Sequence, residues 1–250
     1  MSDATKVALV TGASYGVGAA TALALARDGF DLVVTATREA NLADTLSALR
    51  DTGRRAAGVE LDLRDQVSIE KTAATAIAAF GRLDVLVNNA GVNLRSKAID
   101  TARDEFEDVL LTNVTGTFFL TQQIGRYWVA QHKLGRVITI ASAHALVGAA
   151  ERSAYGISKA ALLQMTRMLA IEWADHGITV NAVAPGRLDT GSPSRASASK
   201  EYMEAMLKRI PLHRLATAGE VAAAALFLAG PGAASITGQT IVIDGGLTAA

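Results

Sequence analysis

The sequence predicts an α/β protein with one doubly wound, seven-stranded parallel sheet and helices on both faces. Short runs rich in β-branched residues alternate with longer, alanine-rich segments of helical period, which is the pattern that βαβ units produce. Half of the 250 residues are hydrophobic and only 5% are aromatic, a composition that suits helices packed tightly on a buried sheet. No linker and no internal repeat divides the chain, so we expect a single domain over residues 1–250.

Seven compact apolar runs, each followed by a loop signal, are the expected strands. They span residues 7–10, 32–36, 56–61, 85–87, 137–141, 179–183 and 240–243. The expected helices lie between them, at roughly residues 16–28, 39–52, 66–80, 104–131, 154–176 and 218–228. Ligands of doubly wound sheets bind beyond the carboxyl ends of the strands, so the loops that follow the strands should hold the site.

One segment interrupts this alternation. Residues 191–200 read GSPSRASASK and are small and polar, and a helical stretch follows at residues 201–210. Such a segment is either a surface insertion or a lid over a binding site, and composition alone does not choose between them. We expect a substrate lid at about residues 190–210.

The charges of the chain balance, with 24 basic and 24 acidic residues, so no long-range field attracts nucleic acid or an anionic membrane. The expected ligand is therefore a small molecule. The chain has no cysteine, and its four histidines show no ligand spacing with carboxylates, so we expect no metal site. No apolar run is long enough for a signal-peptide core or a membrane span, and we expect a cytoplasmic protein.

A glycine-rich loop, TGASYGVG at residues 11–18, connects the first strand to an alanine-rich helix. Glycines let the backbone turn sharply and approach a pyrophosphate, and the helix N-terminus offers unpaired N–H groups to it. The alternative is an ordinary strand-to-helix turn. The loop predicts a dinucleotide cofactor held by Gly12, Ser14, Tyr15, Gly16, Val17 and Gly18.

The end of the second strand indicates which dinucleotide binds. An acidic side chain there would accept hydrogen bonds from the ribose hydroxyls and repel a 2′-phosphate. This chain has Thr37 at that place, and Arg38 follows, whose guanidinium can bind a phosphate through two N–H groups. Alternatively, Arg38 is a solvated charge beside Glu39. We expect NADP(H), with NAD(H) as a possible second cofactor.

Tyr155 and Lys159 are four residues apart, so they lie one turn from each other on the same helix face. The pKa of a free tyrosine is near 10, and the charge of Lys159, together with a positive nicotinamide ring, would lower it. Such a tyrosine can give a proton to a carbonyl oxygen or take one from an alcohol. By itself, however, this spacing is also that of any amphipathic helix.

Two more polar residues support a catalytic interpretation. Ser142 ends the fifth strand, where its hydroxyl can hold the reacting oxygen against Tyr155. Asn113 lies within an expected helix, where asparagine is unfavourable and often marks a kink or a buried water. The alternatives are a strand-end cap for Ser142 and a tolerated helix defect for Asn113.

These motifs occur in the order and spacing of the short-chain dehydrogenase/reductase family, which the chain resembles over almost its whole length. They are the glycine loop, the NNAG segment at residues 88–91, Asn113, Ser142, Tyr155 with Lys159, and Pro185-Gly186. The resemblance implies a Rossmann fold, hydride transfer between NADP(H) and a carbonyl or alcohol carbon, and a homotetramer built on the helices at residues 104–131 and 154–176.

The resemblance also implies roles for single residues. Asp62 and Leu63 would form the adenine pocket, and Asn113 would hold, through its side chain, a water that links Lys159 to solvent. Thr190 would bind the nicotinamide carboxamide. The remaining residues implied near the cofactor are Asn88, Asn89, Ala90, Gly91, Pro185, Gly186 and Leu188.

The substrate stays open between a 3-oxoacyl thioester and a sugar or other secondary alcohol. Carrier-protein reductases often have an arginine before the glutamate that follows the catalytic lysine, and Ile171 stands there before Glu172. The rival hypothesis is a protein of the same fold that binds a dinucleotide without catalysis. Such a protein needs no proton donor, so the presence of Ser142, Tyr155 and Lys159 together favours an enzyme. The candidate substrate residues are Asn93, Leu94, His144, Glu151 and Arg187.

Overall fold

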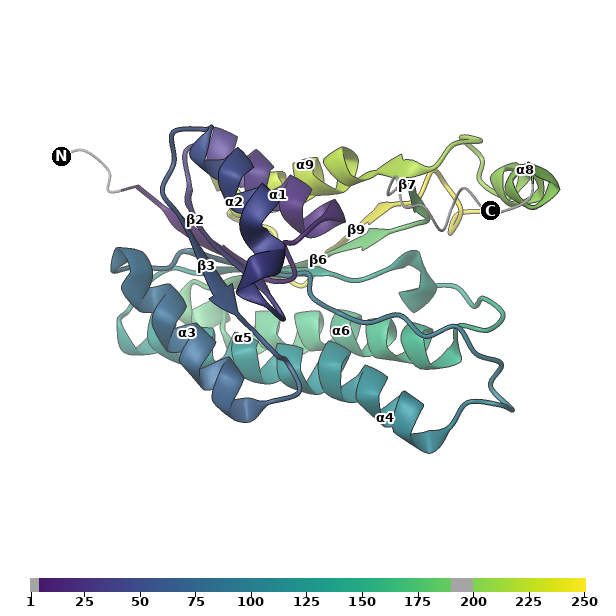
Figure 1. Ribbon diagram of the computed structural model, residues 1–250, viewed down its shortest axis with the longest axis horizontal. Helices are drawn as coiled ribbons and strands as arrows, with labels where there is room; N and C mark the ends of the chain where they lie inside the picture. Colours follow the sequence, from purple (N-terminus) through teal and green to yellow (C-terminus); the bar gives the residue numbers. More distant parts are fainter. Residues whose placement is uncertain (1–4, 190–199) are drawn as a thin grey trace.

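The structure, a computed structural model, describes residues 5–189 and 200–250. A seven-stranded, wholly parallel sheet runs through its centre in the order β3-β2-β1-β4-β5-β6-β9 (Figure 1). The strands are β1 (Val7–Val10), β2 (Asp31–Ala36), β3 (Ala56–Glu60), β4 (Val85–Asn88), β5 (Arg136–Ile140), β6 (Thr179–Pro185) and β9 (Thr240–Ile243). The predicted fold class and strand set are confirmed. The strand order reverses between β1 and β4, which is the expected ligand position.

Helices cover both faces of this sheet, as predicted. On one face lie α1 (Gly16–Arg27), α2 (Ala43–Arg50) and α9 (Ala218–Ala229), and on the other α3 (Gln66–Phe80), α5 (Thr117–Ala130) and α6 (Ser153–Glu172) (Figure 1). The remaining described α-helices are α4 (Arg103–Leu110), which leads into α5, and α8 (Lys200–Lys208), near the C-terminus in this view. None of the described helices has the length and apolarity needed to cross a membrane.

The core consists of two main apolar layers, one on each side of the sheet. Leu25 of α1 and Val34 belong to one layer, and Ile124 and Trp128 of α5 belong to the other. Every residue of β1, β2 and β4 is buried, because both faces of the sheet are covered. This is why these strands appear in the sequence as continuous apolar runs and not as alternating ones.

The structure differs from the expected elements in four places. The expected helix 104–131 is α4 and α5 joined by a π-helical turn, η2 (Leu111–Gly116). The expected helix 39–52 begins as a 3₁₀ turn (Glu39–Leu42), and helix 154–176 ends as one (Ala174–His176). A two-stranded sheet of β7 (Leu188–Asp189) and β8 (Ala216–Thr217) was not predicted, because strands of two residues show no periodicity.

The helical stretch expected at residues 201–210 is α8, which begins at Lys200 and ends at Lys208. The first half of the expected lid, Thr190 included, lies outside the described residues.

Candidate active site

The glycine loop after β1 is tightly packed at two of its glycines. Gly12 has a φ of +62°, and a Cβ added there would lie 2.8 Å from the Cα of Ala90. A Cβ on Gly18 would lie 2.3 Å from the carbonyl oxygen of Gly12. Any side chain at either position would therefore displace backbone, which gives the physical reason for glycine.

Side chains from the loop after β4 and from α2 hold this backbone in place. Asn89 Nδ2 donates to the carbonyl oxygens of Thr11 at 3.0 Å and Gly12 at 2.9 Å. Thr45 Oγ1 donates to the carbonyl oxygen of Ala13 at 2.8 Å and, more weakly, to that of Ser14 at 3.4 Å. Asn89 therefore supports the loop directly.

The N-terminus of α1 is open on its outer side. A Cβ on Gly16 would meet no atom within 4 Å, and Val17 is partly buried against the core. Tyr15, in the N-cap position, is 79% exposed and makes no capping bond with its side chain, and the first turn holds no acidic residue. The first N–H groups of α1 are thus available to an anion, which fits a dinucleotide pyrophosphate.

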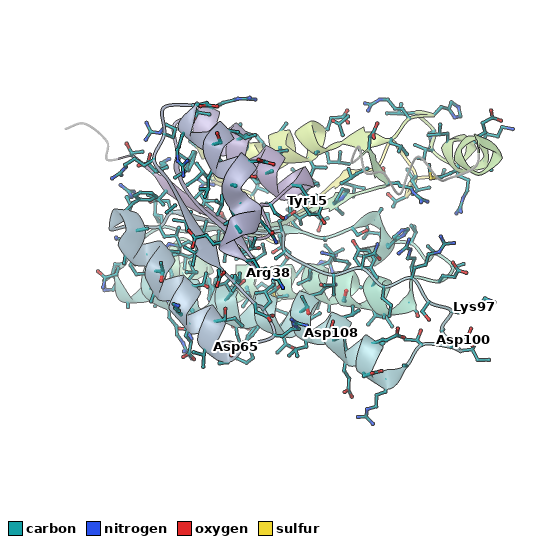
Figure 2. The ribbon with its side chains drawn as sticks, viewed as in Figure 1. Tyr15, Arg38, Asp65, Lys97, Asp100 and Asp108 are labelled. Carbon is teal, nitrogen blue, oxygen red and sulfur yellow. The ribbon has the colours of Figure 1, made fainter. Side chains whose placement is uncertain are left out.

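Thr37 and Arg38 directly follow β2 and are exposed, on the same edge of the sheet as Tyr15 (Figure 2). Within the described part of the chain, Arg38 makes no ion pair. The nearby Glu39 uses its backbone N–H to bond the carboxylate of Glu60 at 3.2 Å. Arg38 therefore keeps its guanidinium available at the position expected for a 2′-phosphate.

The residues expected at the adenine end are already engaged with protein groups. Asp62 accepts hydrogen bonds from Arg64 Nε at 3.0 Å and Nη2 at 2.9 Å, and these lower the pKa of Asp62 below its usual value. The side chain of Leu63 is 5% exposed and belongs to the core. A cofactor contact by Leu63 would therefore come from its backbone, and adenine binding by Asp62 stays a prediction.

The segment after β4 connects the cofactor loop to the catalytic residues. Asn88 is buried and donates to Thr121 Oγ1 at 2.8 Å, so its side chain joins the sheet to α5 and does not face a cofactor. A Cβ on Gly91 would lie 2.8 Å from Asn113 Oδ1 and 3.7 Å from Lys159 Nζ. Glycine at residue 91 lets the chain pass directly beside the catalytic groups.

Tyr155 and Lys159 face the same place from α6, as their spacing predicts. Lys159 Nζ lies 5.7 Å from the centre of the Tyr155 ring and donates to the carbonyl oxygen of Ile140 at 2.9 Å. Ser142, two residues beyond the end of β5, lies close enough for its hydroxyl to lower the pKa of Tyr155. The structure therefore brings these three predicted residues together.

Burial controls the protonation of both ionisable groups. Burial raises the pKa of Tyr155, while the Ser142 hydrogen bond and the positive charge of Arg152 lower it in part. Burial lowers the pKa of Lys159 to about 8. In the structure described, burial outweighs both effects, and the one charge that acts on Tyr155 is that of Arg152. The expected lowering of the Tyr155 pKa by Lys159 together with a positive nicotinamide ring stays a prediction.

Asn113 lies in the π-helical turn, where its side chain closes a small network. Its Oδ1 accepts from the backbone N–H of Val92 at 2.7 Å. Its Nδ2 donates to the carbonyl oxygen of Val92 at 2.9 Å and to Ser158 Oγ at 3.0 Å. Both amide hydrogens of Asn113 are used, and Oδ1 keeps one free lone pair. A water could therefore bind this side chain only by donating to Oδ1, and the proton-relay role stays a prediction.

The candidate substrate residues lie on the loops after β4, β5 and β6, together with two arginines that the sequence analysis did not single out. Arg152 Nη1 donates to Asn93 Oδ1 at 2.7 Å, and Arg95 Nε donates to Glu151 Oε2 at 2.6 Å. Arg152 precedes Tyr155 by three residues, and residues three apart on a helix lie on the same face. This spacing could have predicted that the two side chains are close. The other predicted members of this group are Leu94, His144 and Arg187.

The end of β6 lies against the C-terminal segment. Pro185 is the last residue of β6, and a Cβ on Gly186 would lie 2.8 Å from the Cα of Asp244, so this approach requires glycine. Leu188 opens β7. Thr190, expected at the nicotinamide carboxamide, lies outside the described residues.

Known proteins resemble the chain over nearly its full length. The family model described as Enoyl-(Acyl carrier protein) reductase matches residues 12–248. The 2-dehydro-3-deoxy-D-gluconate 5-dehydrogenase of Dickeya dadantii (strain 3937) is 35% identical over 241 residues, which are 96% of this chain and 94% of that protein. The 3-oxoacyl-[acyl-carrier-protein] reductase FabG of Salmonella typhimurium is 38% identical over 250 residues and 99% of both chains. A solved structure of a proposed 2-deoxy-D-gluconate 3-dehydrogenase from Agrobacterium tumefaciens with bound NADP has a TM-score of 0.90 and 32% identity, covering 98% of this chain and 97% of that one.

Proposed function

This chain belongs to the short-chain dehydrogenase/reductase family of oxidoreductases that act on CH–OH and C=O groups, and within it we propose an NADP(H)-dependent enzyme with Tyr155 as its general acid and base. The observation that carries the proposal is the convergence of Ser142, Tyr155 and Lys159 on one place at the carboxyl edge of the sheet. The nicotinamide cofactor, when bound, supplies or accepts the hydride.

The residues of the chain fit such a cofactor. The compact turn at Gly12 and Gly18, the open space at Gly16 and the uncapped first turn of α1 suit a pyrophosphate. Arg38 suits a 2′-phosphate.

Each catalytic residue has a distinct task in the proposed mechanism. The Tyr155 hydroxyl gives its proton to the substrate oxygen during reduction and takes it back during oxidation. Ser142 donates a hydrogen bond to the same oxygen and orients it. Lys159, held by the carbonyl oxygen of Ile140, keeps a positive charge beside the phenol below about pH 8. Together with a positive nicotinamide ring, that charge would favour the phenolate form of Tyr155.

A dinucleotide-binding protein without catalysis is the second candidate. It would have the glycine loop but no need for a partly buried phenol beside a buried ammonium. NADPH oxidation with a panel of ketones, aldehydes and 3-oxo compounds tests the proposal. Binding of NADPH without turnover of any carbonyl would favour the second candidate.

The choice of cofactor gives a quantitative prediction. We expect kcat/KM to be about ten- to a hundred-fold higher with NADPH than with NADH, because one arginine–phosphate interaction contributes about 1.5–3 kcal/mol. Arg38→Ala should reduce this ratio, mainly by weakening NADPH. Arg50→Ala, which removes an exposed arginine at the last turn of α2, is the matched control and should leave the ratio unchanged. A wild-type ratio of one or less would contradict the assignment.

The relatives differ in substrate, since one acts on a sugar acid and another on a 3-oxoacyl group attached to a carrier protein. We propose a small carbonyl or secondary alcohol for this chain. Ile171, 76% exposed, stands where carrier-protein reductases often have an arginine, which disfavours docking of a carrier. A chain without cysteine suits the reducing cytoplasm, where we place the enzyme.

The oligomeric state is a further prediction. The run of α4, η2 and α5 lies beside α6, and apolar side chains of α6 are exposed: Ile157 by 51%, Met168 by 48% and Ile171 by 76%. We propose a homotetramer that covers this face. Sedimentation at micromolar concentration should give the mass of four chains. Met168→Glu should reduce that mass, whereas Ile99→Glu, at a loop residue that is 91% exposed, should not. A single-chain mass for the wild-type protein would refute the assembly.

A further inference from the structure

Arg152 is a half-buried arginine immediately before α6 and three residues before Tyr155. Its carbonyl oxygen accepts from the backbone N–H of Gly156 at 2.7 Å, which joins its position to the first turn of the helix. Its Nη1 donates to the side-chain oxygen of Asn93 at 2.7 Å. The loop after β4 and the start of α6 together fix where this guanidinium lies.

The charge of Arg152 has no partner of opposite sign within ion-pair distance among the residues that the structure describes. Asn93 is a neutral amide. The adjacent carboxylate, Glu151, is bound by Arg95 Nε at 2.6 Å, and Arg95 is the main cause of the lowered Glu151 pKa. A partly desolvated guanidinium that still has unused N–H donors is a ready site for an anion.

This charge lies close to the reacting groups. Burial raises the pKa of the Tyr155 hydroxyl, and the charge of Arg152 offsets part of that rise. Burial lowers the pKa of the His144 imidazole, and the same charge adds to that lowering, so Arg152 acts on both residues. The His144 and Tyr155 rings are 6.3 Å apart at an angle of 79°, and the backbone N–H of His144 donates to Ser142 Oγ at 3.2 Å. Arg152, His144, Ser142 and Tyr155 therefore surround one position.

His144 is a neutral donor at this position. Burial, with the positive charges of Arg152 and Arg187, lowers its pKa and keeps the ring uncharged at neutral pH. Its Nδ1 is buried and has no hydrogen-bond partner. Because a buried N–H without a partner costs more than a lone pair without one, the proton is favoured on Nε2. His144 then presents an N–H group to a ligand oxygen.

We propose that the substrate is an oxo or hydroxy acid whose carboxylate binds Arg152, while His144 Nε2–H donates to a further oxygen of the same molecule. The proposal rests on the proposed function and names its substrate class. One guanidinium matches the single charge of a carboxylate, whereas a phosphate dianion would leave one charge unpaired. The acidic groups of an acyl carrier protein lie on the surface of the carrier. They would bind at the surface of this protein and would not reach Arg152 beside Tyr155.

Matched substrate pairs that differ in the carboxylate test this inference. One pair is acetoacetate and ethyl acetoacetate with NADPH, and the other is D-gluconate and D-glucitol with NADP⁺. In the wild-type protein we expect kcat/KM to be about ten- to a hundred-fold higher for the acid of at least one pair, the effect of one charge-assisted interaction. Arg152→Gln, which keeps an amide able to bond Asn93, should bring the acid-to-neutral ratio close to one.

Two further variants make the result specific. Lys97→Gln removes a positive charge from the same loop as Asn93, at an exposed residue, and should leave the ratio unchanged (Figure 2). Arg152→Lys keeps the positive charge but cannot bind a carboxylate through two N–H groups at once. Its acid-to-neutral ratio of kcat/KM should therefore lie between those of the wild type and Arg152→Gln. If Arg152→Gln does not fold, the Arg152→Lys ratio decides, and a wild-type value there would overturn the role of Arg152.

The outcomes separate this inference from the proposed function. Turnover of the neutral compounds at rates equal to or above those of the acids would overturn the inference and leave the oxidoreductase proposal standing. An acid preference that survives in Arg152→Gln would also overturn it, because the carboxylate would then be bound elsewhere. Failure of every compound, charged or neutral, with both cofactors would instead count against the proposed function itself.

Discussion

Tyr155→Phe should lower kcat by about three orders of magnitude, near the middle of the range for loss of a general acid. The change removes only the hydroxyl. The ring, with its contact to His144 and its place 5.7 Å from Lys159 Nζ, is kept. We therefore expect the dissociation constant of NADPH, measured by fluorescence titration, to change by less than about threefold.

Tyr127→Phe provides the matched control for Tyr155→Phe. Tyr127 lies on α5, and its hydroxyl accepts a hydrogen bond from Lys133 Nζ at 2.6 Å. The control also loses one phenol hydroxyl with a partner, but it should keep wild-type kcat. A Tyr155→Phe enzyme with near wild-type kcat would show that the proton comes from another group.

The raised pKa of Tyr155 predicts opposite pH dependences for the two directions of the reaction. Reduction uses the protonated phenol, so its rate should be maintained at neutral pH and fall as pH rises through the Tyr155 pKa. Oxidation uses the phenolate, so its rate should increase toward alkaline pH. In Tyr155→Phe, any residual rate should lose this dependence.

Lys159→Met should separate stability from activity. Lys159 is fully buried, and its pKa is lowered from 10.5 to about 8 because burial penalises the ammonium. The lowered pKa means that the buried ammonium destabilises the folded protein by about 3 kcal/mol at pH 7. The methionine variant escapes this cost but loses the hydrogen bond to the Ile140 carbonyl, which contributes about 1 kcal/mol of stability. Methionine fills the space without the charge. We expect Tm at pH 7 to rise by roughly 4–8 °C, while kcat falls by about a hundredfold or more.

The pH dependence of that stability has a defined sign. Between about pH 8 and pH 10.5 the unfolded chain binds more protons at Lys159 than the folded protein does, so the wild type becomes more stable as pH rises through this window. The advantage of Lys159→Met should therefore be largest below pH 8 and shrink above it. Thermal melting at pH 7 and pH 10 measures this. Lys97→Met, at an exposed lysine, should alter neither Tm nor kcat. A lower Tm for Lys159→Met at pH 7, or retained activity, would contradict the prediction.

Local sequence patterns were sufficient for most of the fold. The strands of the sheet were predicted to within two residues at each end, because strands covered on both faces are continuous apolar runs bounded by turn residues. The pairing of Tyr155 with Lys159 was also predictable, since helical geometry puts residues four apart on one face. In contrast, the π-helical turn at Asn113 depends on bonds to Val92 and Ser158, which lie far away in the sequence.

The sequence by itself determined the order of strands and helices along the chain, the glycine loop and the placing of Tyr155 and Lys159 on one helix face, because each depends on neighbours within a few residues. Only the tertiary structure decided how these groups ionise and what surrounds them. Arg152 meets Asn93 across 59 residues of chain, and Lys159 reaches the Ile140 carbonyl across 19. The physical reason is that burial and charge are sums over all atoms nearby in space, and the burial that lowers the pKa of Lys159 exists only when the sheet and α6 have packed together.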